Sequence, residues 1–255
     1  MTATNTQPTM PWHASVTATL KGLFGGAGDG ATTRRLAGTV FTIRVLGAAL
    51  AYATQILLAR WMGESDYGVY AYVWTWLVTL GSMLDLGMAI SAQKFIPLHR
   101  RDDPELLRGF LHASRWLTFA AACVAALLLA GVVAIVTPWI DPRFVAPAYL
   151  GCLALPAFVA ANMQDGIARS HDWMKLAQVP QFVARHALTI GFTAGFVALG
   201  FKLGATAATA ISVAAIWLAM TGQFLLLRGH LAAAVSPGPR RYAMRAWIKT
   251  ALPIL

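Results

Sequence analysis

Hydrophobic residues make up 58% of this 255-residue chain and charged residues only 12%, with a net charge of +10. Soluble domains typically contain about 25% charged residues, so the composition excludes an ordinary soluble globular protein. The mean hydropathy of +0.60 indicates a polytopic membrane protein.

Residues 1–35 are rich in Thr, Gly and Pro and lack the apolar core of a signal peptide, which predicts a disordered cytoplasmic tail. Residues 36–228 contain six stretches that are apolar and long enough to cross a bilayer core of about 30 Å. We therefore predict an all-α integral membrane protein, a six-transmembrane-helix bundle. Its spans are expected at about 37–59, 69–96, 116–136, 145–165, 178–201 and 205–227.

The loop before the third span, "PLHRRDDPELLRGFLHASRW", carries a helix-start signal. Asp102 or Asp103 can cap a helix, and Pro104 suits its first position. We expect an interfacial helix that runs directly into the third span.

Two later spans carry packing signals. Pro147 and Pro156 in the fourth span free backbone groups that neighbouring residues or water must satisfy. Gly191 and Gly195 in the fifth span have the GxxxG spacing that permits close approach of helices.

Residues 229–255 are expected to form a cytoplasmic loop and the truncated start of a seventh helix. Basic residues precede the final "ALPIL", but five residues at about 1.5 Å each cannot cross a membrane. The sequence reads as a piece of something longer.

The distribution of the basic residues explains the net charge. Placing the N-terminus inside puts fifteen lysines and arginines in inner segments and three in outer loops, as the positive-inside rule requires, which argues against nucleic-acid binding. The three outer residues are Arg60, Arg143 and Lys202, and two further arginines, Arg44 and Arg185, fall within spans.

Three ionisable residues fall at one level of the membrane. Arg44 and Asp85 are predicted about 13 Å from the inner boundary, and Arg185, with His186 beside it, about 15 Å. Such groups usually face a bundle interior or a hydrated cavity and pair with one another.

Arg44 and Asp85 are the obvious pair, either as a structural lock or as substrate-facing groups. Arg185 then lacks an acidic partner unless Asp165 or a segment beyond this chain supplies one. We hypothesise a cationic cavity, open to the cytoplasm, in which Arg44, Arg185 and His186 bind an anionic head group. Asn162 and Asp165 are candidate polar residues at its inner mouth.

Enzymatic activity has the least support. The sequence contains no nucleophile–base set and no metal-ligand spacing, so no catalytic residue, metal or cofactor is expected.

The segment "LLARWMGESDYGVYAYVWTWLVTLGSMLDLGMAISAQKFIP" resembles the amino-terminal part of polysaccharide flippases, the O-antigen and capsule exporters of the multidrug/oligosaccharidyl-lipid/polysaccharide exporter superfamily. The shared pattern is "LLARWMG", then the turn "ESDYG" followed by aromatic residues, then "DLG" at Asp85–Gly87. Arg44 lies where many relatives carry a basic residue in the first helix.

The resemblance implies one lobe of a two-lobe exporter fold in a bacterial inner membrane, with its N-terminus in the cytoplasm. It implies the flipping of undecaprenyl-pyrophosphate-linked oligosaccharide by alternating access during surface polysaccharide (lipopolysaccharide, O-antigen) synthesis. The expected partners are membrane lipid, this lipid-linked substrate, and polysaccharide polymerase and chain-length proteins.

Two alternative functions remain open at the level of sequence. The first is a cation-coupled small-molecule exporter of the same superfamily, with Asp85 as the coupling carboxylate. The second is a non-transporting membrane scaffold of a polysaccharide assembly complex.

Overall fold

A computed structural model describes the backbone of residues 29–251 and the side chains of residues 37–251. The chain divides into two units, residues 1–42 and 43–255, and the helical bundle belongs to the second. The tail predicted for residues 1–28 and the last residues, 252–255, lie outside the described part of the chain.

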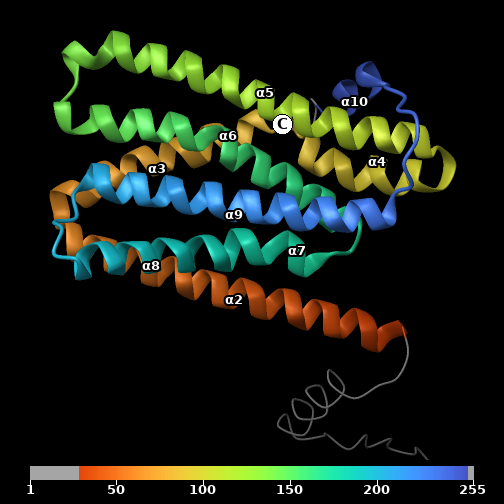
Figure 1. Ribbon diagram of the computed structural model, residues 1–255, viewed down its shortest axis with the longest axis horizontal. Helices are drawn as coiled ribbons and strands as arrows, with labels where there is room; N and C mark the ends of the chain where they lie inside the picture. The colour runs from red at the N-terminus through yellow and green to blue at the C-terminus, as the bar shows by residue number, and fades with distance from the viewer. Residues whose placement is uncertain (1–28, 252–255) are drawn as a thin grey trace, which may run out of the picture. The chain divides into compact units, whose positions relative to one another are not determined.

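Every regular element of the described residues is helical (Figure 1). The α-helices are α2 (Asp29–Met62), α3 (Glu64–Leu84), α4 (Met88–Asp102), α5 (Pro104–Val136), α6 (Pro142–Ser170), α7 (Met174–Gln178), α8 (Arg185–Ala198), α9 (Ala205–Ala234) and α10 (Met244–Ala251). A 3-10 turn, Thr137–Trp139, follows α5, and a π-helical turn, Val179–Ala184, joins α7 to α8.

Five helical segments of the described residues are long and apolar enough to cross a membrane. They are Ala37–Met62, Glu64–Asp102 (α3 with α4), Pro104–Trp139, Pro142–Ser170 and Ala205–Ala234. The prediction of an all-α, multi-pass membrane protein is confirmed. The fifth predicted stretch, 178–201, is not among them, because the π turn divides it and its longest helix, α8, has 14 residues.

The predicted start of the interfacial helix is confirmed at α5. Asp103 is its N-cap, and the carboxylate accepts hydrogen bonds from the backbone N–H groups of Glu105 (3.1 Å) and Leu106 (3.0 Å). Pro104 occupies the first turn, where its missing N–H has no helical partner to lose. The helix continues without interruption to Val136, so the loop and the third span are one element.

The second predicted span is interrupted at Asp85–Gly87, between α3 and α4. Leu86 (φ 54°) and Gly87 (φ 65°) both adopt left-handed backbone conformations, which glycine tolerates and leucine does not favour. The Gly87 N–H donates to Oδ1 of Asp85 over 2.7 Å. The carboxylate therefore satisfies a backbone group that the interruption leaves free inside the membrane span.

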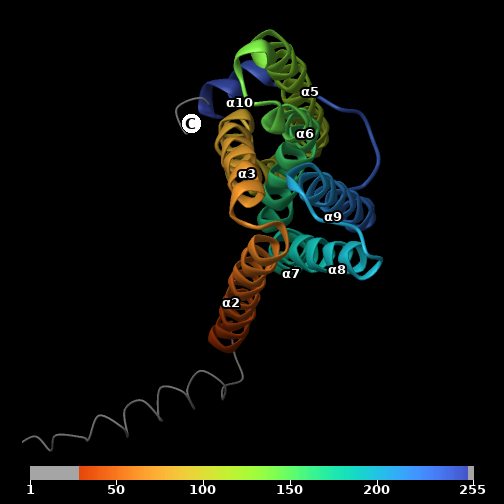
Figure 2. The same ribbon diagram turned by 90° about the vertical axis from the view of Figure 1, so that its left-hand side faces the viewer.

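α6 lies at the centre of the bundle and contacts α3, α4, α5 and α9 (Figure 2). Glycines make two of these approaches close, because an added Cβ would collide with the Ala89 backbone at Gly166 and with the Phe158 ring at Gly81. Gly191 and Gly195 do not make the close approach that their spacing permits, because within the described residues no neighbouring atom lies within 4 Å of a Cβ built at either position.

Both predicted prolines of the fourth span lie buried inside α6. Near Pro156 a neighbouring helix supplies a donor to the carbonyl beside the one that the proline frees: Nε1 of Trp217, on α9, donates to the carbonyl oxygen of Leu153 over 3.1 Å. Leu153 lies three residues before the proline, in the turn where the ring disrupts the helical hydrogen bonds. α6 is thereby tied to α9 at mid-span.

After α9 the chain crosses α5 and reaches α10 through residues 236–243, the α9–α10 segment (Figure 1). The Arg241 N–H donates to the carbonyl of Glu105 over 3.1 Å, and the Arg241 guanidinium pairs with Asp103. Gly109 permits this crossing, because a Cβ there would collide with the Arg241 carbonyl. The predicted cytoplasmic loop is thus a short segment bound to the start of α5.

α10 begins where a seventh helix was expected and packs against α4. Trp247 is 1% exposed, and its ring meets Phe110 edge-on with centroids 5.3 Å apart. Burial of a tryptophan this size is worth roughly 2–3 kcal/mol, which holds this end of the chain on the bundle.

Candidate functional site

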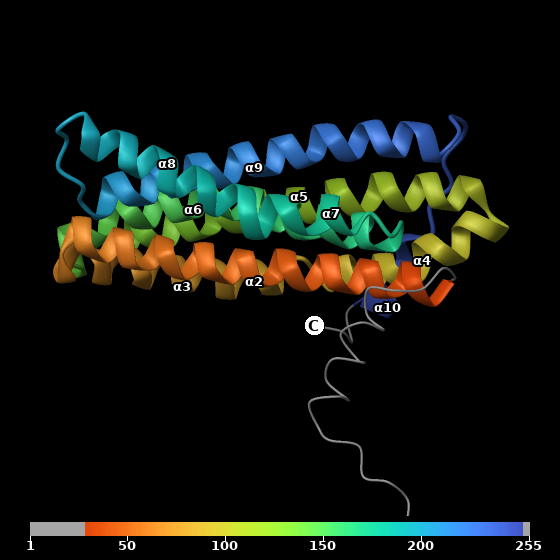
Figure 3. The same ribbon diagram turned by 90° about the horizontal axis from the view of Figure 1, so that it is seen from below.

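The fifth apolar stretch is broken by the π turn, which contains Pro180. Proline has no N–H, so the carbonyl four residues earlier, that of Leu176, loses its helical donor. The buried amide of Gln223, on α9, replaces it: Nε2 donates to the carbonyls of Leu176 (3.1 Å) and Ala177 (3.4 Å). Figure 3 shows α7 and α8 in line with one another and α9 alongside. Turns of this kind often accompany functional sites.

Arg185 follows the π turn directly. Its guanidinium carbon lies 5.6 Å from the centre of the Trp74 ring, and Nη2 donates to Nε2 of His186 over 3.2 Å. Because arginine can only donate, this bond requires a neutral His186 ring. The ion pairs formed by residues 37–251 are Asp141–Arg143, Asp165–Arg169 and Asp103–Arg241. None of them involves Arg185, so its charge has no carboxylate partner in the described residues.

Arg44 lies near the other side of the π turn. Its guanidinium carbon is 5.9 Å from the centre of the Phe182 ring, and the side chain is exposed. Asp165 is near enough to interact with the charge of Arg44, but its carboxylate pairs with Arg169 over 2.7 Å. The structure therefore places Arg44, from α2, beside the π turn that Arg185 follows, and gives Asp165 a partner elsewhere.

The predicted ion pair between Arg44 and Asp85 is not among those that residues 37–251 form. The Asp85 carboxylate lies at the interruption between α3 and α4 and bonds to the Gly87 N–H. Depth in the membrane was predicted from residue counts along straight helices. A residue count does not show that the helix breaks at Asp85. At this break the Gly87 N–H becomes the nearest partner of the carboxylate.

Asn162 and Arg185 both line a small pocket between α6, the π turn and α9. Its volume is about 10 Å³, room for roughly one water molecule. Arg44, which lies exposed beside Phe182, is not part of its lining, so the cationic cavity expected at this level stays a prediction.

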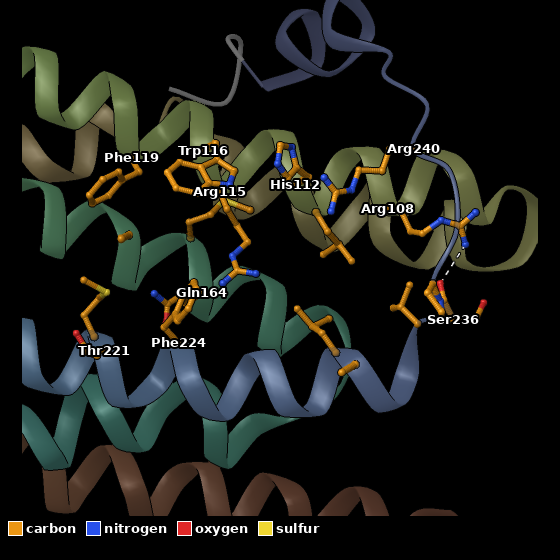
Figure 4. Close-up of a pocket in the computed structure, with 18 of the residues that line it drawn as sticks. Arg108, His112, Arg115, Trp116, Phe119, Gln164, Thr221, Phe224, Ser236 and Arg240 are labelled. Atoms are coloured by element: carbon orange, nitrogen blue, oxygen red, sulfur yellow. Dashed lines mark hydrogen bonds between the residues drawn. The ribbon is translucent and has the colours of Figure 1, made fainter.

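A larger cavity, about 630 Å³, lies between α5, α6, α9 and the α9–α10 segment. Arg108 and Arg115 from α5, Gln164 from α6 and Arg240 from the α9–α10 segment line it (Figure 4). Arg108 donates to the carbonyls of Pro239 (2.7 Å) and Ser236 (3.2 Å) and so holds that segment beside the opening.

The sequence contains a signal for this cavity: the basic residues that line it from α5 share one face of the helix. Arg108, His112, Arg115 and Phe119 are spaced by four, three and four residues, which places them along one face of a helix. The positive-inside rule explains how many arginines lie in this segment. It does not use the fact that they share one face, which is what indicates a cationic cavity.

A family model described as "Polysaccharide biosynthesis protein" matches residues 35–245. Searches of curated proteins and of solved structures give no match. The match begins before the first predicted span and ends inside α10, so it covers all six predicted spans. The chain belongs to this polysaccharide biosynthesis family, as a multi-pass membrane member.

Proposed function

We propose that this protein moves lipid-linked oligosaccharide from the inner to the outer leaflet of a bacterial inner membrane, by alternating access. The carrier lipid would be an undecaprenyl pyrophosphate. Family membership supports a role in polysaccharide biosynthesis, and the observation that carries the proposal further is Arg185. The protein is then a transporter, acting beside polysaccharide polymerase and chain-length proteins.

A cation within a membrane bundle is costly, by roughly 2.5–3.5 kcal/mol on insertion scales. Arg185 has aromatic and imidazole neighbours but no carboxylate among the described residues. A guanidinium without a carboxylate partner favours an anion with two acceptor oxygens, and a pyrophosphate provides them. The π turn places this group at an interruption of the helix, where a local rearrangement is easier than in an unbroken one.

The orientation in this proposal follows the basic residues. Arg169, Arg241 and the start of α5 are expected on the cytoplasmic side, and the turn between α2 and α3 on the outer side. The N-terminus is then cytoplasmic. Arg44, exposed beside Phe182, would meet the anionic head group before Arg185 does.

The proposal is tested by substituting Arg185 in the native gene and introducing it into a strain that lacks that gene. Arg185→Gln should lower surface polysaccharide about tenfold, the equivalent of one lost charge-assisted hydrogen bond. Lipid-linked oligosaccharide should accumulate on the inner leaflet. Arg185→Lys, which keeps the charge but not the planar fork, should give an intermediate loss.

Arg228→Gln is the matched control, because this exposed arginine of α9 lies outside both pockets. It should leave surface polysaccharide at the wild-type level. Immunoblots of the membrane fraction establish that all variants are present in equal amount. Wild-type polysaccharide in Arg185→Gln at equal protein level would refute the proposed role of this arginine.

A cation-coupled exporter is the competing function, and Asp85 is its discriminating residue. The hydrogen bond from Gly87 gives the carboxylate a structural task that needs an acceptor oxygen and no titration. The flippase proposal therefore expects transport to survive Asp85→Asn.

A further inference from the structure

The large cavity changes in polarity along its length. Figure 4 shows Arg108, Arg240 and Ser236 at one end, Phe119 and Thr221 at the other, and Arg115, Gln164 and Phe224 between them. Arg108 and Phe119 are eleven residues apart on α5, or about 16 Å. The cavity therefore runs parallel to the helices, from a cationic end to an aromatic one.

Arg115 is the charged group at the middle of the cavity. Its guanidinium carbon lies 4.6 Å from the centre of the Phe224 ring. Its Nη2 atom is buried and has no hydrogen-bond partner among the described residues, and the same holds for Oε1 of Gln164 across the cavity. Figure 4 shows Arg115 extending from α5 toward Gln164 and Phe224. A buried donor left unpaired is destabilising, so the site favours a ligand that accepts a hydrogen bond here.

The charge of the cavity is positive and uncompensated. Arginines Arg108, Arg115 and Arg240 line it, and its lining, all within the described residues, includes no aspartate or glutamate. Arg108 bonds to backbone carbonyls, which are neutral acceptors and do not cancel its charge. A ligand that matches this end is an anion.

The other end matches a hydrocarbon chain. Phe119, Trp217, Met220 and Ala160 line it, and none of these carries a charge. At the rim, Trp116 is 62% exposed and Phe224 37% exposed, on α5 and α9 respectively. Both helices belong to segments that are long and apolar enough to cross a membrane, so these exposed rings give the cavity an apolar rim.

We propose that this cavity binds one anionic phospholipid of the surrounding bilayer. Its phosphate lies at Arg115, within reach of the charges of Arg108 and Arg240, and its first chain lies along Phe119 and Trp217. The lipid belongs to the cytoplasmic leaflet if this end is cytoplasmic as proposed above, whereas binding itself does not depend on orientation or on transport. The bound lipid would supply the acceptor that Nη2 of Arg115 lacks in the protein alone.

The test uses the purified chain reconstituted in nanodiscs of equal parts phosphatidylglycerol and phosphatidylcholine, with native mass spectrometry of the released protein. The wild type should retain one phosphatidylglycerol, in about tenfold excess over phosphatidylcholine. Arg115→Gln should lose that preference about tenfold, and Arg115→Lys should keep part of it. Arg228→Gln removes the same charge outside the cavity and should behave as the wild type.

Ala160→Phe provides a second test at the aromatic end, because it fills the space assigned to the chain without touching a charge. It should also lower lipid retention while the melting temperature stays near that of the wild type. Equal retention of phosphatidylglycerol by the wild type and Arg115→Gln would overturn the proposal, as would equal retention of the two lipids by the wild type.

The chain extracted directly from cells gives the last arm of the test. Retention of a prenyl-pyrophosphate saccharide in this cavity, lost in Arg115→Gln, would overturn the phospholipid assignment and make the cavity part of the substrate path. The two proposals can fail separately. If Arg185→Gln has no effect on surface polysaccharide, the proposed function fails, but the expected retention of phosphatidylglycerol at Arg115 is the same.

Discussion

Asp85 shows how a carboxylate is accommodated inside a membrane span without an ion pair. The break between α3 and α4 frees the Gly87 N–H, and the carboxylate accepts its hydrogen bond over 2.7 Å. Asp85→Ala removes that acceptor and should lower the free energy of unfolding by about 1 kcal/mol. Asp85→Asn keeps an acceptor oxygen and should be close to neutral. Thermal unfolding in detergent measures both.

Transport by the same two variants separates the capping role from ion coupling. If Asp85 only caps the backbone, surface polysaccharide in Asp85→Asn should equal that of the wild type. Loss of polysaccharide in Asp85→Asn at an unchanged melting temperature would instead identify Asp85 as a coupling carboxylate, in favour of the exporter alternative.

Among the elements, the α7–π turn–α8 stretch depends most on a partner. Pro180 removes the helical donor of the Leu176 carbonyl, and the Gln223 amide donates to that carbonyl and to the carbonyl of Ala177. Gln223→Leu leaves those carbonyls buried without a donor and should lower the free energy of unfolding by about 1–3 kcal/mol. Chemical denaturation in mixed micelles provides the measurement.

A double mutant tests this explanation of the π turn. Pro180→Ala restores a backbone N–H, so Gln223→Leu should cost less in the Pro180→Ala background than in the wild type. If the two substitutions are strictly additive, Gln223 does not compensate for the proline, and the π turn needs another cause.

At the scale of the whole molecule, the α9–α10 segment closes one end of the large cavity. Its crossing over α5 depends on Gly109, where a Cβ would collide with the Arg241 carbonyl. Gly109→Ala should shift the segment off α5 and speed trypsin cleavage after Arg240 and Arg241 about tenfold, as expected for an overpacking cost near 1.4 kcal/mol. Gly131→Ala, on the same helix with no neighbouring atom within 4 Å, is the control.

The cleavage rates of these two variants show whether the close approach at Gly109 holds the segment on α5. Gly131→Ala should be cut as slowly as the wild type, since alanine is favoured over glycine in an open helical position. Equal rates for Gly109→Ala and Gly131→Ala would mean that the close approach at Gly109 does not hold the segment, and that its ion pair and hydrogen bonds to α5 do.

The sequence by itself determined the membrane class, the positions of most helices and the start of α5. These features depend on composition and on residues within one turn of each other: Asp103 caps α5 through the N–H groups of Glu105 and Leu106. Local chemistry of this kind is the same whichever way the helix later packs.

The tertiary structure alone decided which glycines meet a neighbour and where the arginines gather. Gly166 is in contact and Gly191 is open, although it is Gly191 and Gly195 that have the spacing that permits close approach. Arg44 and Asp85 share a predicted depth yet form no pair, while Arg115 faces a cavity. Depth follows from a residue count along one helix, whereas contact requires the rotation and breaks of several helices, which only their mutual packing determines.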